Sequence, residues 1–193
     1  MSEQEPVLRG EHARRRVLRA ALDVLAEHGS LGFTIEAVAK RAGASKATLY
    51  RRWASRRELL VEAMDEYASR PLPQPMTGNV HSDLLEFMRS GQSLLREQLF
   101  PRLMAAFIDA AERDPTLQHM HAAISESRRQ PLRRVLIEAR ARGEIPPSAD
   151  LELAIDLLAA PGFYRRFVAH QPFDEVYAAA VVDHVLRALD ANV

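Results

Sequence analysis

A short polar segment near residue 50 carries side chains suited to binding an anionic partner. Its cationic and hydroxyl side chains are Lys46, Thr48, Tyr50, Arg51 and Arg52. Groups of these two kinds contact the phosphate oxygens and base edges of nucleic acids. Leu49 and Trp53 lie four residues apart, so they can anchor the same segment to an apolar core. The pattern predicts a short helix with a polar outer face.

The residues before this segment predict a second helix that supports it. Apolar side chains recur at i, i+3, i+4 and i+7 in the order Ile35, Val38, Ala39 and Ala42. Thr34 can cap the start of that helix, and Gly43 provides the turn after it. Ser45 can cap the polar helix. Two helices joined in this way describe a helix-turn-helix, whose second helix enters the DNA major groove. An ordinary helical hairpin has the same spacing.

The distribution of charge favours the helix-turn-helix over the ordinary hairpin. Between Arg9 and Arg57 there are twelve Lys or Arg against four Asp or Glu, a difference of +8 in a chain whose net charge is zero. A concentration of basic side chains is typical of nucleic-acid binding. The run from Arg14 to Arg16 can contact phosphates or form a solvated charged face, and the sequence leaves both open. Residues 71–193 carry a net charge of −3, which suits a part that does not contact DNA.

From Gly32 to Trp53 the sequence GFTIEAVAKRAGASKATLYRRW resembles the DNA-binding domain of the TetR family of transcriptional regulators. The resemblance extends from about Val17 to Tyr67. It includes the turn at Ala42 and Gly43, the pair Leu49 and Tyr50, the aromatic Trp53 and the basic Arg56. One departure is Arg52, where many members carry His.

The resemblance implies an all-α protein of about nine helices. An N-terminal three-helix helix-turn-helix domain would be followed by a C-terminal helical ligand-binding and dimerisation domain. We place the first domain, with a linking fourth helix, at residues 1–70 and the second at residues 79–193. Pro71–Gly78 holds three prolines and a glycine, so it cannot continue a helix and marks the boundary.

The function implied is sequence-specific DNA binding by a transcriptional regulator. A repressor that a small effector releases from a palindromic operator is the first expectation, with an activator on the same fold as an alternative. The expected DNA-binding residues are Thr34, Ser45, Lys46, Thr48, Tyr50, Arg51, Arg52 and Arg56. Another alternative is a helical ligand- or partner-binding protein that does not bind DNA.

Large apolar side chains after residue 79 are candidates for an effector pocket. They are Phe87, Met88, Leu95, Met104, Phe107, Ile108, Met120, Ile124, Phe163, Tyr164 and Phe167. Met and aromatic residues at helical spacing also suit an ordinary core, and judged alone the pattern favours the core. The resemblance favours a pocket, because family members bind small effectors in this domain. Few charged side chains are expected to face inward, so we expect a largely apolar effector.

The helices near the C-terminal end are expected to form a homodimer through about residues 151–190. The segment Val176–Leu189 carries apolar side chains on more than one face, which is typical of a helix buried on more than one side. Such a helix lies at the centre of its domain or packs against another subunit, and in the second case Val181 and Val185 are expected at the interface. The resemblance also implies pairing of the last two helices, and two copies would present two helix-turn-helix units to a two-fold operator.

Motifs for catalysis and cofactor binding are absent from the sequence. It contains no H-E-x-x-H, phosphate-binding G-x-x-x-x-G-K-[ST] or G-x-G-x-x-G motif, and no cysteine. His119 and His121 are two residues apart and lie on different helix faces, so we expect no metal site. Glu152 and Asp156 share a helix face with no nucleophile nearby. We expect a non-enzyme without cofactors, located in the bacterial cytoplasm, since neither a signal peptide nor a membrane-spanning run is present.

Overall fold

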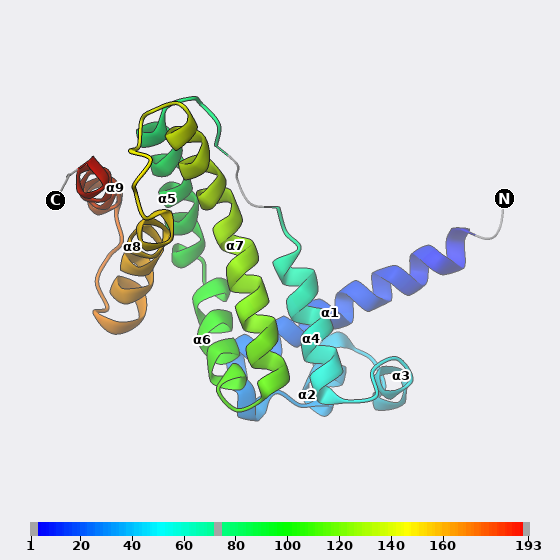
Figure 1. Ribbon diagram of the computed structural model, residues 1–193. Helices are drawn as coiled ribbons and strands as arrows, with labels where there is room; N and C mark the ends of the chain where they lie inside the picture. Colours follow the sequence, from blue (N-terminus) through cyan, green and yellow to red (C-terminus); the bar gives the residue numbers. More distant parts are fainter. Residues whose placement is uncertain (1–3, 72–74, 191–193) are drawn as a thin grey trace. The chain divides into compact units, whose positions relative to one another are not determined.

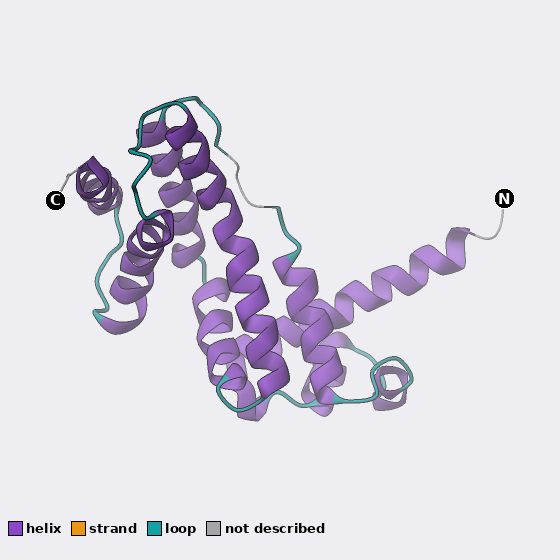
Figure 2. Cartoon of the chain, in the orientation of Figure 1, coloured by secondary structure: helices purple, strands orange, loops and turns teal. Residues whose placement is uncertain are grey.

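The computed structural model describes residues 4–71 and 75–190, and all regular structure in these ranges is helical (Figures 1 and 2). The helices are α1 Gln4–Gly32, α2 Ile35–Ala42, α3 Lys46–Tyr50, α4 Arg56–Ala68, α5 Val80–Arg96, α6 Leu99–Ala111, α7 Pro115–Ala141, α8 Leu151–Phe163 and α9 Glu175–Asp190. A π-helical turn, η1 Tyr164–Val168, follows α8. The expected all-α fold is therefore confirmed. None of the helices in these ranges is long and apolar enough to cross a membrane.

The expected side-chain caps define the helix-turn-helix. Thr34 Oγ1 accepts a hydrogen bond from the backbone N–H of Ala37 at 3.1 Å, which fixes the start of α2. Ser45 Oγ accepts from the backbone N–H of Thr48 at 3.1 Å and starts α3. Between them Gly43 ends α2 with φ 60° and ψ 40°, a left-handed conformation that costs a residue with a side chain about 1–2 kcal/mol. The turn therefore depends on glycine at this position.

The start of α4 is fixed by a reciprocal pair of hydrogen bonds. Ser55 Oγ accepts from the backbone N–H of Glu58 at 3.1 Å. The carboxylate of Glu58 accepts in return from the backbone N–H of Ala54 at 2.8 Å. The sequence S-x-x-E thus acts as a capping box, with its second bond one residue before the cap itself.

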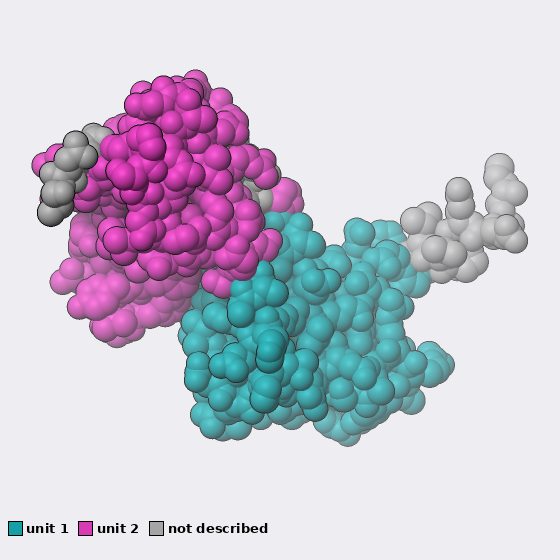
Figure 3. Space-filling view, in the orientation of Figure 1, with its two compact units in different colours: residues 1–70, 98–124 teal, residues 71–97, 125–193 magenta. Residues whose placement is uncertain are grey.

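The first of two compact units comprises residues 1–70 and 98–124 (Figure 3). Helix α1 packs against α2, α4 and α6 within it. Large, fully or almost fully buried side chains form its core, among them Phe33, Leu49, Trp53, Leu59 and Phe107. Leu49 anchors α3 from its inner side, and Trp53, which the spacing predicts on the same helix, is buried in the segment that follows α3.

The second compact unit comprises residues 71–97 and 125–193. Its α5 packs against α8 and α9, and α8 packs against α9. The core contains Leu84, Leu132, Leu136, Ile155 and Val182. Gln92 is a buried polar side chain whose Nε2 donates to the carbonyl oxygen of Phe173 at 2.8 Å, which satisfies it and fixes the loop before α9.

The two compact units do not coincide with the two parts of the chain that lie before and after residues 71–78. Residues 98–124 follow that stretch but belong to the first unit, because Leu103, Phe107 and Leu117 are buried in its core. Pro71–Gly78 does separate α4 from α5, and its residues 72–74 lie outside the described part of the chain. The assignment of separate functions to residues 1–70 and 79–193 stays a prediction.

Candidate nucleic-acid interface

Helix α3 has one buried side and one exposed polar side. Leu49 is fully buried, whereas Lys46, Thr48, Arg51 and Arg52 are exposed and Tyr50 is 52% exposed. Three of the eight predicted DNA-binding residues, Lys46, Thr48 and Tyr50, therefore lie on α3, and Arg51 and Arg52 follow in the turn directly after it. Cations and hydroxyls on the outer side of a rigidly anchored helix can contact phosphates and base edges.

The indole of Trp53 is hydrogen-bonded to an ion-pair network that the sequence pattern did not indicate. Its indole Nε1 donates to Glu62 Oε2 at 2.6 Å. Glu62 also accepts from Arg14, which in turn pairs with Glu11 at 2.9 Å and with Glu66 at 3.4 Å. Hydrogen bonding to Glu62 raises the pKa of Arg14 above its ordinary value, so it remains charged. Arg14 thus helps to position Trp53, which lies in the segment after α3, through Glu62.

Two of the exposed side chains of α3 have partners inside the protein. Lys46 Nζ lies 2.9 Å from Glu36 Oε1, a carboxylate in the first turn of α2. Thr48 Oγ1 lies 2.9 Å from Ser45 Oγ. Sequence reasoning did not select Glu36, because its pairing with Lys46 depends on the geometry of the turn between α2 and α3. Arg51 makes no side-chain hydrogen bond or ion pair with any residue the structure describes.

Arg56 and Thr34 lie at the junction of three helices. Arg56 Nη1 donates to the carbonyl oxygens of Ser30 at 3.4 Å and Phe33 at 3.2 Å. Thr34 follows directly and its hydroxyl caps α2. Both side chains therefore have structural roles in the free protein, and their contacts with DNA stay predictions.

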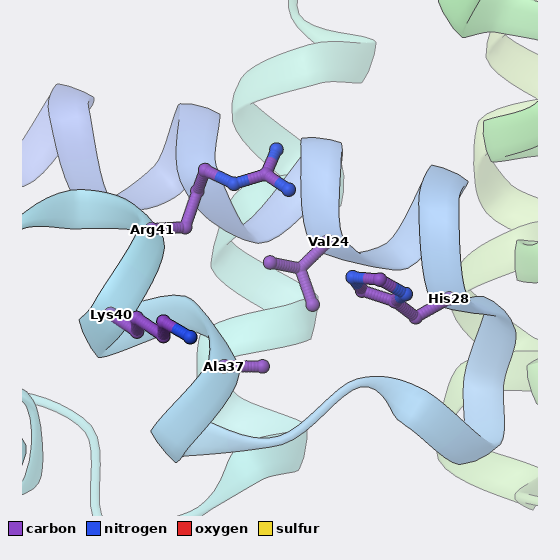
Figure 4. Close-up of a pocket in the computed structure, with 5 residues that line it drawn as sticks. All are labelled: Val24, His28, Ala37, Lys40 and Arg41. Carbon is purple, nitrogen blue, oxygen red and sulfur yellow. The ribbon is translucent and has the colours of Figure 1, made fainter.

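A hollow of about 470 Å³ lies between α1 and α2 (Figure 4). Val24 and His28 line it from α1, and Ala37, Lys40 and Arg41 line it from α2. The guanidinium of Arg41 forms two hydrogen bonds to the carboxylate of Glu27, which lowers the pKa of that carboxyl group. None of the residues predicted to line an effector site contributes to this hollow.

The predicted effector-binding residues are divided between the two compact units. Met104, Phe107, Ile108, Met120 and Ile124 belong to the first unit, and Phe87, Met88, Leu95, Phe163, Tyr164 and Phe167 belong to the second. Phe107 is a fully buried core side chain, with Met120 and Ile124 packed against the same core. Phe163 and Tyr164 are exposed. A single pocket lined by all eleven residues stays a prediction.

The polar pairs considered for metal or acid-base chemistry have ordinary partners. His119 Nδ1 lies 2.6 Å from the carbonyl oxygen of Pro115, and the ring of His121 packs edge-on against Phe107 at 5.5 Å. Glu152 is paired with Arg133 at 2.7 Å, and Asp156 forms an ion pair with Arg129. These carboxylates belong to a charged helix surface.

Comparison with known sequences identifies both parts of the chain. Residues 17–63 match the family described as bacterial regulatory proteins, tetR family, and residues 74–185 match the family described as tetracyclin repressor-like, C-terminal domain. An uncharacterized HTH-type transcriptional regulator of Mycobacterium tuberculosis is 34% identical over 173 residues, covering 88% of this chain and 84% of that protein. A DNA-binding transcriptional repressor TetR of Mycobacteroides abscessus is 32% identical over 188 residues, covering 95% of this chain and 96% of that protein.

Solved structures share the fold. The TetR family transcription regulator SCO0332 superposes with a TM-score of 0.65 at 29% identity, covering 91% of this chain and 97% of that one. MexZ, a repressor from Pseudomonas aeruginosa, superposes with a TM-score of 0.73 at 18% identity, covering 91% and 95%, which is a likeness of fold alone. The matched families consist of regulators rather than enzymes. With its capped helix-turn-helix and both family matches, this chain is a DNA-binding transcriptional regulator that belongs to the TetR family.

Proposed function

We propose that this protein is a repressor that binds a palindromic operator as a homodimer and is released by a small, largely apolar effector. The observation that carries the proposal is the exposed polar side of α3, held rigidly by Leu49 and Trp53. A recognition helix must enter the major groove without losing its orientation, and the buried anchors and the Glu62 network supply that rigidity. Its place of action would be the bacterial cytoplasm, where the operator is found.

Exposed apolar side chains near the C-terminal end support the homodimer. Leu153, Leu157 and Tyr164 are all exposed, and the two leucines lie four residues apart on one side of α8. Large apolar groups gathered on an outer surface favour burial against another surface. A second copy of the chain would cover this side with its own α8 and place two α3 helices on one operator.

The exposed apolar side of α8 differs from the interface positions that the sequence predicts on Val176–Leu189. The apolar pattern of that segment predicts that Val181 and Val185 face a partner subunit. Val185 is buried in the core of the second unit, and Val181 packs against that core. The proposed interface therefore uses the outer side of α8, within the predicted range of 151–190.

For the effector, we propose binding among the predicted apolar side chains that are not fully buried. Phe87 and Phe167 are half-buried, and the rings of Phe163 and Phe167 lie 5.8 Å apart. Phe167 lies in the π-helical turn η1 and Phe163 directly precedes it, and such turns are often found at functional sites. Aromatic side chains of this kind suit a largely apolar ligand.

Repression is favoured over activation by the relative from Mycobacteroides abscessus, which carries the name of a repressor and matches almost the full length of this chain. The proposed mechanism of repression is occupation of DNA that the transcription machinery needs. An effector would release the protein only through a difference in its affinity for the DNA-bound and free conformations, typically worth about 1–3 kcal/mol.

The experiment that tests this function is selection of DNA from a random duplex pool with the purified full-length chain. The expected result is an inverted repeat whose half-sites lie about one helical turn apart, bound by two chains. The selected site is then placed over the promoter of a reporter gene, and the protein is supplied in the same cell. Reduced reporter expression supports repression, whereas increased expression assigns the activator role.

A selected site without two-fold symmetry would contradict DNA binding by a homodimer. Failure to enrich any sequence at low salt would contradict DNA recognition by α3. For the effector, a panel of small apolar and polar compounds is added to the bound operator. Release by polar compounds alone would contradict the apolar class.

A further inference from the structure

An exposed carboxylate lies beside the predicted recognition helix. Glu36 is in the first turn of α2, and Lys46 is the first residue of α3. Glu36 Oε1 lies 2.9 Å from Lys46 Nζ, and the two side chains are 51% and 59% exposed. The pair therefore presents an acceptor and a donor next to each other on the surface.

A negative charge on Glu36, beside the predicted recognition helix, is unexpected in a protein that binds a polyanion. The hydrogen bond from Lys46, followed by a backbone hydrogen bond, lowers the pKa of Glu36, so its carboxyl group is charged at neutral pH. An exposed ion pair contributes little to folding stability. Near phosphates a negative charge weakens binding to every DNA sequence, because the protein gains affinity from cations. Its position in the first turn of α2 gives the carboxylate a small stabilising interaction with the helix N-terminus, whereas general DNA affinity gains nothing from it.

Recognition of a DNA base gives the carboxylate of Glu36 a function. A carboxylate only accepts hydrogen bonds, and in the major groove the amino group of cytosine N4 is a donor that Glu or Asp can bind. A lysine donates to O6 and N7 of guanine. In a G·C pair the cytosine amino group and guanine O6 are hydrogen-bonded to each other, so they are neighbours on the groove edge. The adjacent acceptor and donor of the protein match that edge.

We propose that Glu36 is a specificity-determining residue, which accepts from a cytosine N4 amino group while Lys46 donates to the guanine of the same base pair. The proposal rests on α3 being the helix that enters the major groove. At the operator the carboxylate finds a donor, and at other sequences it meets phosphates and acceptor groups without one. Specificity is a difference between two affinities, and Glu36 enlarges it by weakening binding to the wrong sequences.

The experiment compares the full-length chain with the variants Glu36→Gln and Lys46→Met and with the double variant. Dissociation constants are measured at one salt concentration for the selected operator, for every symmetric single-base-pair variant of it, and for a duplex of unrelated sequence. Glu27→Gln is the matched control. It removes an exposed carboxylate that is also paired with a cation, Arg41, between α1 and α2.

Glu36→Gln is expected to bind the unrelated duplex several-fold more tightly, because one negative charge is removed. At one G·C position in each half-site it should lose discrimination by about 5- to 150-fold, the range of a good base contact. Lys46→Met should lose discrimination at the same position, and the double variant should lose little more than either single one. Glu27→Gln should leave discrimination at that position unchanged.

Two results would overturn the inference. Equal tightening on all sequences by Glu36→Gln, with discrimination unchanged, would show that the carboxylate only repels DNA. A lower melting temperature with unchanged discrimination would show that it only stabilises the N-terminus of α2. If no duplex is selected by the wild-type chain, the proposed function itself fails, and that outcome is distinct from the first two.

Discussion

Arg56 Nη1 lies 3.2 Å from the carbonyl oxygen of Phe33, a contact that spans 23 residues of sequence. The same nitrogen donates to the carbonyl oxygen of Ser30 at 3.4 Å, and the hydroxyl of Ser30 donates to Asp109 on α6. Arg56, the first residue of α4, therefore donates to carbonyl groups at the end of α1, beside Thr34, where α2 begins. Carbonyl groups near a helix end need donors, and a guanidinium supplies several in a fixed geometry.

Replacing Arg56 by alanine is expected to lower both stability and DNA binding. Loss of a charged donor to two carbonyl groups should reduce the free energy of unfolding by about 1–2 kcal/mol. DNA affinity should fall by a similar factor for all sequences, and the salt slope should fall by about one if the remaining donors contact a phosphate. Urea unfolding and titrations at several salt concentrations measure the two effects.

Arg56→Lys separates the two roles, because lysine keeps the charge but cannot supply two donors in the same plane. We expect it to retain the salt slope and lose part of the stability. Unchanged unfolding of both variants would show that the contacts with Ser30 and Phe33 do not hold the junction.

The helix-turn-helix could be predicted in detail from the sequence because its signals are local. Thr34, Ser45 and Ser55 cap helices through bonds to residues three positions ahead, and Gly43 ends α2 with a conformation that glycine favours. Each of these features involves neighbours in the chain, so spacing and residue type are sufficient to locate them.

The candidate site could be predicted only in part, because several of its contacts join distant residues. Arg14 reaches Glu66 across 52 residues, and no periodic pattern indicates that pairing. Phe107 was a candidate for an effector pocket, but it packs in the same core as Leu49 and Phe33. An apolar residue on a helix predicts burial, whereas what covers it is decided by tertiary packing.

Lys46 and Arg51 are expected to read bases, and their loss should change sequence preference. Removing a base contact should cost about 1–3 kcal/mol of discrimination at one operator position. Tyr50→Phe should instead weaken binding equally for all sequences, because a hydroxyl bonded to phosphate carries no sequence information. Dissociation constants for single-base-pair variants of the operator distinguish these outcomes. A triple variant of Lys46, Tyr50 and Arg56 with unchanged DNA affinity would refute α3 as the recognition helix.

The carboxylate of Glu144 gives the stability of the second unit a dependence on pH. It accepts from the backbone N–H of Val80 at 2.7 Å, and this bond, followed by one from Arg142, holds the pKa of Glu144 below its usual value. A carboxyl group with a lowered folded pKa stabilises the folded chain above its unfolded pKa. That stabilisation is lost as the pH falls through the lowered folded value.

Glu144→Gln should therefore be less stable than the wild type at pH 7, and the difference should shrink below about pH 4. Urea unfolding at pH 7 and near pH 3 measures it. Glu86→Gln, on the exposed side of α5, is the control and should show a smaller difference at pH 7. A difference for Glu144→Gln that is equal at both pH values would mean that its charge is not responsible.

The outer side of α8 predicts how dimerisation can be abolished without unfolding the chain. Leu157 is 45% exposed in the single chain, so Leu157→Glu should fold normally. In the proposed homodimer it would bury an unpaired charge, at a cost of several kcal/mol. Sedimentation equilibrium should give about twice 21.7 kDa for the wild type and the single-chain mass for the variant.

Two further variants test whether the loss of the dimer is specific to the outer side of α8. Leu31→Glu introduces the same charge at a leucine that is 80% exposed on α1, outside residues 151–190, and should leave the dimer intact. Val185→Asp places a charge at a side chain only 6% exposed, so it should unfold the second unit rather than release a folded monomer. A wild-type chain that is monomeric at micromolar concentration, or a Leu157→Glu variant that remains dimeric, would show that α8 is not the interface.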